Sequence, residues 1–356
     1  MNILYQFNEK YAPYAGVSMT SLFENNKAAK FICVYILGEN LSSDSAEKIN
    51  RLCQEYNREV VFVDTSALVD KMKSINMPTY RGSYAANMRL FVSDIVENVS
   101  GDCDRTGVAG RDIKETGVNK VDNRLLYLDA DTIVTGDLTQ MYTSEIKTLG
   151  MVYDTLGCQH KYEIGLEADE GYYNSGVILY DLDKWKNKNF TEKIIDHVIN
   201  VRAQYPSPDQ DLINVVVRDE ITPIPFENNF QPHLRDYGYI SFMKAFNLSP
   251  FYSGSEVSKA NANPTIMHAF RYIGEFPWHK GNVHPFNREF DKYLKLSPWS
   301  DYIKLPSDSG MVMKIEKILY RLLPKVAFLK IFTMAHRRFY MNANKKSEKN
   351  EISKVM

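Results

Sequence analysis

Pairs of aspartates separated by one residue are the pattern here with the clearest chemistry, because two carboxylates at a strand end can hold a hard divalent cation. Four such pairs occur, beginning at residues 102, 129, 181 and 209. Only Asp129 and Asp131 directly follow a buried-looking strand, residues 125–128. In an open α/β sheet the ligand crevice lies beyond the carboxyl ends of the strands. We therefore predict that this pair anchors a metal, with aspartate capping of a solvated turn as the alternative.

The overall composition excludes several classes of partner and site. The 356 residues carry a formal net charge of -1, so no global field favours nucleic acid or another polyanion. The four cysteines form no C-x-x-C pair, which argues against a zinc site or a disulfide framework and favours a reducing compartment. Glu9 and Lys10 interrupt the segment where a signal peptide needs an apolar run, so we expect a cytoplasmic protein.

Short apolar strands alternate with segments of helical period, which is typical of βαβ units and a mostly parallel sheet. We expect a single α/β domain over residues 1–300 that presents Asp129 and Asp131 at a strand end. The glycine-rich segment 100–122 is predicted to be a surface loop. The expected strands cover 3–7, 31–37, 60–63, 125–128, 149–153 and 176–180, and the expected helices cover 12–24, 44–56, 83–97, 191–205 and 209–217.

The last segment, 301–356, is predicted to be a basic amphipathic helical tail. Between residues 314 and 346, nine lysine or arginine residues accompany one acid, Glu316, and are interleaved with large apolar side chains. Pro324 should divide the segment into two helices, each too short to cross a bilayer. This pattern favours peripheral contact with the inner face of an anionic membrane. Packing of the apolar stripe on the main domain, or on a second subunit of a homo-oligomer, is the alternative.

Six segments occur in a fixed order around these aspartates. They are NILYQFNEKYAPYAGVSMTSL, a helix with Met88-Arg89-Leu90, LLYLDADTIVTGDL, YYNSGVILYDLDKW, PDQDLIN and MHAFRYIGEFPWHKG. This ordered set covers about residues 1–290 and resembles the family 8 glycosyltransferases, the group with glycogenin and the bacterial lipopolysaccharide galactosyl- and glucosyltransferases. The resemblance implies a GT-A type fold. It also implies retaining transfer of glucose or galactose from a UDP-sugar to a glycan, glycolipid or glycoprotein acceptor.

The resemblance implies a metal site and a phosphate contact. Asp129 and Asp131 would hold the cation together with His268, and mixed oxygen and imidazole ligation suits Mn²⁺, with Mg²⁺ as the alternative. Ala130, between the two aspartates, would contact the substrate. Arg89 would hold a diphosphate oxygen or a sugar hydroxyl. From the residues alone, His268 would be interpreted as a packed polar side chain and Arg89 as half of a surface ion pair.

The resemblance also implies which residues surround the reacting carbon. Asp209 and Gln210 would stabilise an oxocarbenium-like state, or one of them would act as a nucleophile. Asn174 would hydrogen-bond the donor sugar, and the adjacent Ser175 would also contact the substrate. Asp154, which follows a strand, would contact the sugar or the acceptor. From the residues alone, a strand-start turn at Asn174 and a helix cap at Asp209 are the alternatives.

Two departures from the family pattern concern the ends of the site. Asn8 stands where bacterial members usually have an aspartate near the uracil, close to Tyr11 in the first segment. Phe276 stands where the family commonly has a lysine that offsets charge on the leaving diphosphate, two residues after Gly274, another implied substrate contact. Three nearby side chains could take the place of this lysine: Arg271, His279 and Lys280.

Three other classes of protein are alternatives to an active glycosyltransferase. A non-catalytic glycosyltransferase-like subunit that binds a nucleotide or a partner would explain Phe276 and Asn8, but it would not explain why all three implied metal ligands and the Asp209–Gln210 pair are present. A nucleotidyltransferase or a Rossmann dehydrogenase would need a glycine-rich phosphate loop after the first strand, and NEKYAPY contains no glycine. We therefore expect a hexosyltransferase.

Overall fold

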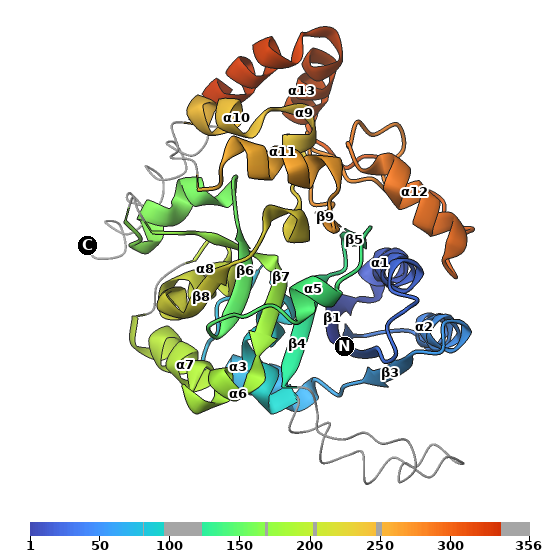
Figure 1. Ribbon diagram of the computed structural model, residues 1–356, viewed down its shortest axis with the longest axis vertical. Helices are drawn as coiled ribbons and strands as arrows, with labels where there is room; N and C mark the ends of the chain where they lie inside the picture. Colours follow the sequence, from blue (N-terminus) through green and yellow to red (C-terminus); the bar gives the residue numbers. More distant parts are fainter. Residues whose placement is uncertain (81, 96–122, 168–169, 202–204, 247–250, 336–356) are drawn as a thin grey trace.

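A seven-stranded sheet with the order β3-β2-β1-β4-β7-β6-β8 forms the centre of the molecule (Figure 1). The computed structural model describes residues 1–80, 82–95, 123–167, 170–201, 205–246 and 251–335, and the predicted loop at 100–122 lies outside them. The pairings β3–β2, β2–β1, β1–β4 and β6–β8 are parallel, which confirms a mostly parallel sheet. Its strands are β1 (Asn2–Asn8), β2 (Cys33–Glu39), β3 (Glu59–Phe62), β4 (Arg124–Asp129), β6 (Leu149–Tyr153), β7 (Tyr173–Asp181) and β8 (Ile221–Pro223).

Two hydrophobic cores lie on opposite faces of this sheet. Neighbouring residues of β1 belong to different cores because side chains alternate across a strand: Tyr5 packs in one with Val17, and Leu4 in the other with Leu90. The helices that supply these cores are α1 (Ala12–Asn25), α2 (Ser43–Glu55), α3 (Ser66–Ser74), α6 (Leu182–Asn187), α7 (Phe190–Val201) and α8 (Pro208–Val216).

Strand β7 runs antiparallel to both of its neighbours, β4 and β6. Because of this reversal, its first residues lie at the same edge of the sheet as the carboxyl ends of β4 and β6. Tyr173 at its start thus pairs with Tyr153 at the end of β6, beyond a β-bulge at Met151 and Val152. Every residue of β7 is buried, so packing on both faces of the sheet fixes the position of this strand.

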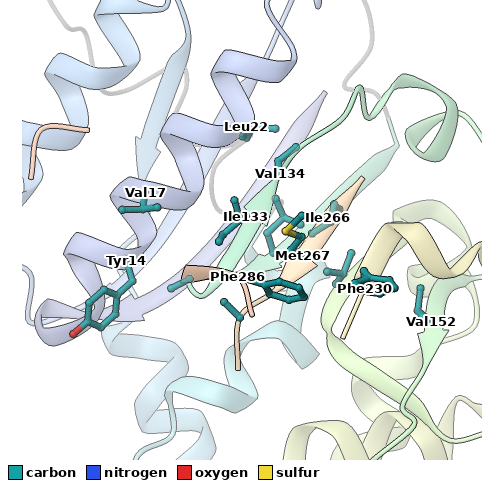
Figure 2. Packing of buried hydrophobic residues seen from close by; sticks show 14 of the residues in the cluster. Tyr14, Val17, Leu22, Ile133, Val134, Val152, Phe230, Ile266, Met267 and Phe286 are labelled. Atoms are coloured by element: carbon teal, nitrogen blue, oxygen red, sulfur yellow. The ribbon is translucent and has the colours of Figure 1, made fainter. Parts of the chain in front are cut away.

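A two-stranded ribbon of β5 (Thr132–Val134) and β9 (Ile266–His268) lies beside the end of β4. The register pairs Thr132 with His268. Figure 2 shows the buried apolar side chains of the ribbon lying between α1 and Phe230. This packing brings His268 beside the aspartates despite its distance along the chain.

The helix predicted over 83–97 is confirmed only in part. The structure has a 3-10 helix there, η2 (Ala85–Phe91), followed by helical residues 92–95. Five consecutive residues of η2, 87–91, are buried, so the segment has no solvent face of the kind that an amphipathic α-helix presents. Two of them are polar and bond inward: Asn87 Nδ2 donates to the carbonyl of Pro78, and Arg89 Nε donates to that of Ala86.

Helix α13 (Met311–Leu322) contacts Asp236 and Glu275, which lie outside the strands of the sheet. Asp236 Oδ2 accepts hydrogen bonds of 2.6 Å from the hydroxyls of both Tyr272 and Tyr320, and Lys317 Nζ lies 2.8 Å from Glu275 Oε1. No helix among the described residues is long and apolar enough to cross a membrane. The remaining elements are η1 (Glu9–Tyr11), α5 (Thr139–Tyr142), η4 (Gly157–Ile164), η5 (Arg218–Glu220), η6 (Phe226–Asn229), α9 (His233–Asp236), α10 (Tyr239–Phe246), α11 (Gly254–Ala262), α12 (Asn287–Leu296), α13 (Met311–Leu322) and helical residues 325–335.

Candidate active site

Three metal-ligating side chains meet at the carboxyl end of β4. One ligand atom from each of Asp129, Asp131 and His268 lies within 4.8 Å of the other two. His268 Nε2 is 3.3 Å from Asp131 Oδ1 and 3.6 Å from Asp129 Oδ2. Burial opposes protonation of His268, but the two carboxylates outweigh burial and raise its pKa. Two carboxylate oxygens and one imidazole nitrogen form a donor set that suits a divalent transition metal.

The orientation of the His268 ring supports this assignment. Its Nδ1 lies 3.1 Å from Asn174 Oδ1 and 3.1 Å from Asn229 Oδ1. An amide oxygen only accepts, so Nδ1 carries the hydrogen and Nε2 is left facing the carboxylates. Nε2 therefore faces two anions, where either a proton or a metal cation balances the charge, and the residues present fit a metal ion.

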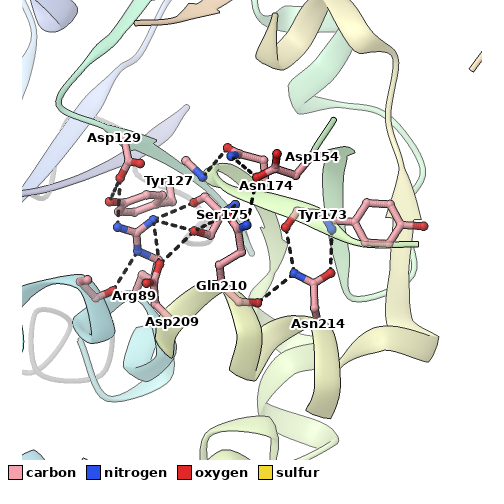
Figure 3. Close-up of polar contacts among 12 residues, drawn as sticks. Arg89, Tyr127, Asp129, Asp154, Tyr173, Asn174, Ser175, Asp209, Gln210 and Asn214 are labelled. Atoms are coloured by element: carbon pink, nitrogen blue, oxygen red, sulfur yellow. Dashed lines mark hydrogen bonds and ion pairs between the residues drawn. The ribbon is translucent and has the colours of Figure 1, made fainter. Parts of the chain in front are cut away.

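Arg89 connects this cluster to a second buried carboxylate (Figure 3). Its Nη2 lies 3.0 Å from Asp129 Oδ1, and its Nη1 lies 3.5 Å from Asp209 Oδ2 and donates to the carbonyl of Ser175 at 2.7 Å. The guanidinium lies over the ring of Tyr127 at 4.1 Å. Burial alone would lower the pKa of Arg89, but the adjacent carboxylates raise it, so the residue stays cationic.

Asp209 and Gln210 lie in the first turn of α8, and both are buried. Asp209 Oδ2 accepts from Ser175 Oγ at 2.9 Å, and Gln210 Oε1 accepts from the Ser175 backbone N–H at 2.9 Å. Gln210 Nε2 donates to Asp154 Oδ2 at 3.0 Å, and Asn174 Nδ2 donates to the same oxygen at 3.0 Å. Burial raises the pKa of Asp209, an effect that Arg89 opposes.

Residues predicted at the other end of the site lie on the β1–α1 connection. Asn8 ends β1, and its shielded Oδ1 has no hydrogen-bond partner among the residues that the structure describes. Tyr11 is half-buried and meets the rings of Tyr14 and Trp278 edge to face. Ala130 is buried between the two aspartates. An orphaned acceptor beside an aromatic ring suits a planar, hydrogen-bonding ligand.

Two predicted substrate contacts, Gly274 and Lys280, have no described contact with this cluster. The carbonyl of Gly274 accepts from Ser309 Oγ, and a Cβ at this position would meet Met313 of α13 at 2.7 Å. Lys280 is exposed, and its backbone N–H donates to Leu305. Their described contacts are therefore with the C-terminal region.

Phe276, at the position where the family commonly has a lysine, is part of an aromatic stack. Its ring lies parallel to Trp278, with centroids 4.4 Å apart, and meets His279 edge to face. The guanidinium of Arg271 lies 5.3 Å from the Phe276 centroid and pairs with Asp308 at 2.6 Å. A cation thus lies beside the ring that stands in the place of the lysine.

Sequence patterns missed two residues of the cluster. Tyr127 supports Arg89, and its hydroxyl donates to Asp129 Oδ1. The alternation of β4 carried a weak signal for it, since Tyr127 and Asp129 are two residues apart and therefore share a face. Asn229 contacts His268 from η6, and no pattern marked it.

The comparison with protein families agrees with this geometry. The model of glycosyl transferase family 8 matches residues 2–100 and 119–281. The chain belongs to this family. The match includes every predicted site residue, from Asn8 to Lys280.

Curated relatives of this family 8 glycosyltransferase span most of its length. Lipopolysaccharide 1,2-glucosyltransferase of Escherichia coli K12 is 26% identical over 327 residues, 89% of this chain and 83% of its own. General stress protein A of Bacillus subtilis 168 is 22% identical over 305 residues, 84% of this chain and 95% of its own. The crystal structure of the galactosyltransferase LgtC with donor and acceptor sugar analogues has a TM-score of 0.63 at 18% identity and covers 83% of this chain and 96% of that chain. This likeness confirms the predicted GT-A type fold.

The first prediction concerns Gly176, against which the His268 ring packs. A Cβ at Gly176 would lie 2.0 Å from His268 Cε1 and 2.8 Å from Asp129 Oδ2, so Gly176→Ala must displace the histidine without removing any ligand. We expect the affinity for Mn²⁺, measured by calorimetry, to fall at least about tenfold. Gly238→Ala is the control, because a Cβ there meets nothing closer than 3.9 Å. Unchanged Mn²⁺ affinity in a folded Gly176→Ala protein would contradict the proposed ligand set.

Proposed function

We propose that this glycosyltransferase moves a hexose, glucose or galactose, from a UDP-sugar to a glycan, glycolipid or glycoprotein acceptor, with retention of configuration and with Mn²⁺ held by Asp129, Asp131 and His268. One observation carries the proposal. Asp129 of the Asp129–Asp131–His268 cluster and the buried Asp209–Gln210 pair lie at the same end of the central sheet, joined by hydrogen bonds through Arg89 and Ser175 (Figure 3).

Each residue in the cluster has a part to play in such a transfer. A divalent cation supplies charge neutralisation for a leaving diphosphate. Arg89 holds Asp129 and Asp209 at fixed positions while remaining cationic, and Asp154 orients the Gln210 amide. Asp209 and Gln210 then face a developing positive charge at the sugar carbon with an anion and an amide dipole that need no reorganisation.

Residues outside the Arg89 cluster would bind the nucleobase and add a positive charge near the leaving diphosphate. The unpartnered Oδ1 of Asn8 suits a donor on a nucleobase, and Tyr11 offers an aromatic surface. Arg271, beside Phe276, is our choice for the cation that replaces the family lysine, because its guanidinium lies over that ring whereas Lys280 is exposed.

A donor-hydrolysis assay tests the function. Purified protein with Mn²⁺ and a panel of nucleotide sugars should release UDP slowly from UDP-glucose or UDP-galactose without acceptor. Exhaustive chelation and Asp131→Asn should each abolish this release while circular dichroism shows an intact fold. If the wild type binds UDP with Mn²⁺ but hydrolyses no donor and transfers no sugar, the chain is the non-catalytic, nucleotide-binding alternative.

The reacting-centre pair makes a separate prediction. Asp209→Asn and Gln210→Ala remove groups assigned to the transition state, so kcat for donor hydrolysis should fall at least about tenfold, about 1.4 kcal/mol of barrier, while the Kd for UDP-sugar changes little. The two constants are measured separately, by turnover and by calorimetry. A Kd that rises in proportion to the loss of rate would assign both residues to substrate binding instead.

We also propose that the tail contacts an anionic membrane. One face of α13 packs on the domain through Leu319 and Tyr320. The opposite face leaves large apolar side chains exposed at the helical spacing i, i+4, i+7, i+11. Lysines and an arginine lie on the same segment and would face anionic headgroups. The exposed apolar residues are Met311, Ile315, Ile318 and Leu322, and the exposed basic residues are Lys314, Arg321 and Lys330.

Substitution of this exposed face tests the membrane proposal without unfolding the tail. Ile315 and Leu322 are 50% and 75% exposed, so Ile315→Ser with Leu322→Ser should leave thermal stability nearly unchanged but abolish co-sedimentation with anionic liposomes at low salt. Ile199→Ser with Val201→Ser, on exposed α7 positions, is the matched control and should still sediment. Equal sedimentation of both variants, or none by the wild type, would assign the exposed face to another partner.

A further inference from the structure

A buried amide, Asn229, lies behind the proposed metal ligands. It ends η6 and is fully buried, with no exposed surface. Its Oδ1 lies 3.1 Å from His268 Nδ1, and its Nδ2 donates to Asn174 Oδ1 at 2.9 Å. One amide therefore contacts the imidazole directly and also holds the second acceptor that the imidazole faces.

The two oxygen acceptors at His268 Nδ1 differ in the number of donors that each one accepts from. Asn174 Oδ1 serves three donors, since it also accepts from the backbone N–H of Gly176 at 3.0 Å and from Asn229. Asn229 Oδ1 has one described partner, the imidazole. An oxygen shared by three donors binds each less firmly than an oxygen given to one. Asn229 thus offers Nδ1–H an acceptor that it shares with no other described donor.

From this geometry we infer that Asn229 is a positioning residue: it fixes His268 with the hydrogen on Nδ1 and Nε2 directed at Asp129 and Asp131, ready for a divalent cation. The inference rests on the proposed metal site. Amide or carboxylate partners on the far nitrogen of a metal-ligating histidine typically change affinity by 10–100-fold when removed. Asn229 supplies such a partner for His268 Nδ1 without adding charge to the site.

The same chain of amides reaches the sugar side of the cluster. Asn174 Nδ2 donates to Asp154 Oδ2 at 3.0 Å, and that oxygen accepts from Gln210 Nε2 at 3.0 Å. His268 and Gln210 are therefore joined through two asparagines and one carboxylate, all buried. Because His268 also contacts Asn174 directly, the chain from the imidazole to Gln210 stays connected when Asn229 is removed.

The experiment measures Mn²⁺ affinity by electron paramagnetic resonance of the free ion in the full-length protein. Asn229→Ala removes the acceptor and should weaken binding by about 10–100-fold. Asn229→Asp keeps an oxygen acceptor for Nδ1–H but replaces the donor to Asn174 Oδ1 with a second acceptor, so it should weaken binding less than Asn229→Ala does. Asn26→Ala, which removes a buried amide bonded to Leu22, Gly136 and Leu138 far from His268, controls for general destabilisation and should bind Mn²⁺ normally.

A second readout separates positioning from a merely structural role. Saturating Mn²⁺ should restore most of the donor hydrolysis of Asn229→Ala, so that the defect appears in the apparent KM for the metal and not in kcat. Wild-type affinity in Asn229→Ala, or equal losses in the alanine and aspartate variants, would overturn the inference while leaving the metal site in place. A wild type that binds no Mn²⁺ would instead overturn the metal site itself, and the inference with it.

Discussion

One buried guanidinium holds the two halves of the site together. Arg89 is almost fully buried between Asp129, at the end of β4, and Asp209, at the start of α8. Without it, two carboxylates would face each other at a sheet edge with little solvent to screen them, and breaking such a buried ion pair typically costs about 3–5 kcal/mol. Three parts of the structure hold the Arg89 guanidinium in place. They are the 3-10 helix η2, the ring of Tyr127 and the carbonyl of Ser175 at the start of β7.

The sequence predicts an element well when the pattern of its own residues decides its structure. It predicts less well when contacts with segments far away in the chain decide. Strands β1, β2 and β4 follow from their short apolar runs, which are largely buried on both faces of the sheet. Helix α2 follows from its period, because it has one clear buried face. The error at 83–97 has a physical source: Arg89 and Asn87 are polar residues on a segment with no solvent face, and periodicity counts such residues as exposed. The reversal of β7 has no local signal either, since direction is decided by pairing with β4 and β6.

The same division applies to the site. Asp129 and Asp131 are predictable because they end a strand, and the family resemblance supplied His268, Asp209 and Gln210, which the structure brings into one hydrogen-bonded cluster with Arg89. Residues that act through other residues have no such signature. Asn229 lies in an irregular segment and becomes meaningful only when the β5–β9 ribbon has set His268 against it.

The position of β9 in the chain has a consequence for biosynthesis. The two carboxylates of the cluster lie on β4 and the turn after it, whereas the imidazole belongs to a strand that follows every strand of the central sheet in sequence. A nascent polypeptide leaving the ribosome therefore carries Asp129 and Asp131 for much of its synthesis without their third partner. Ribbon closure, and with it a complete set of ligands, must wait until residue 268 has emerged, so capture of the cation is timed to the end of sheet assembly and not to its beginning.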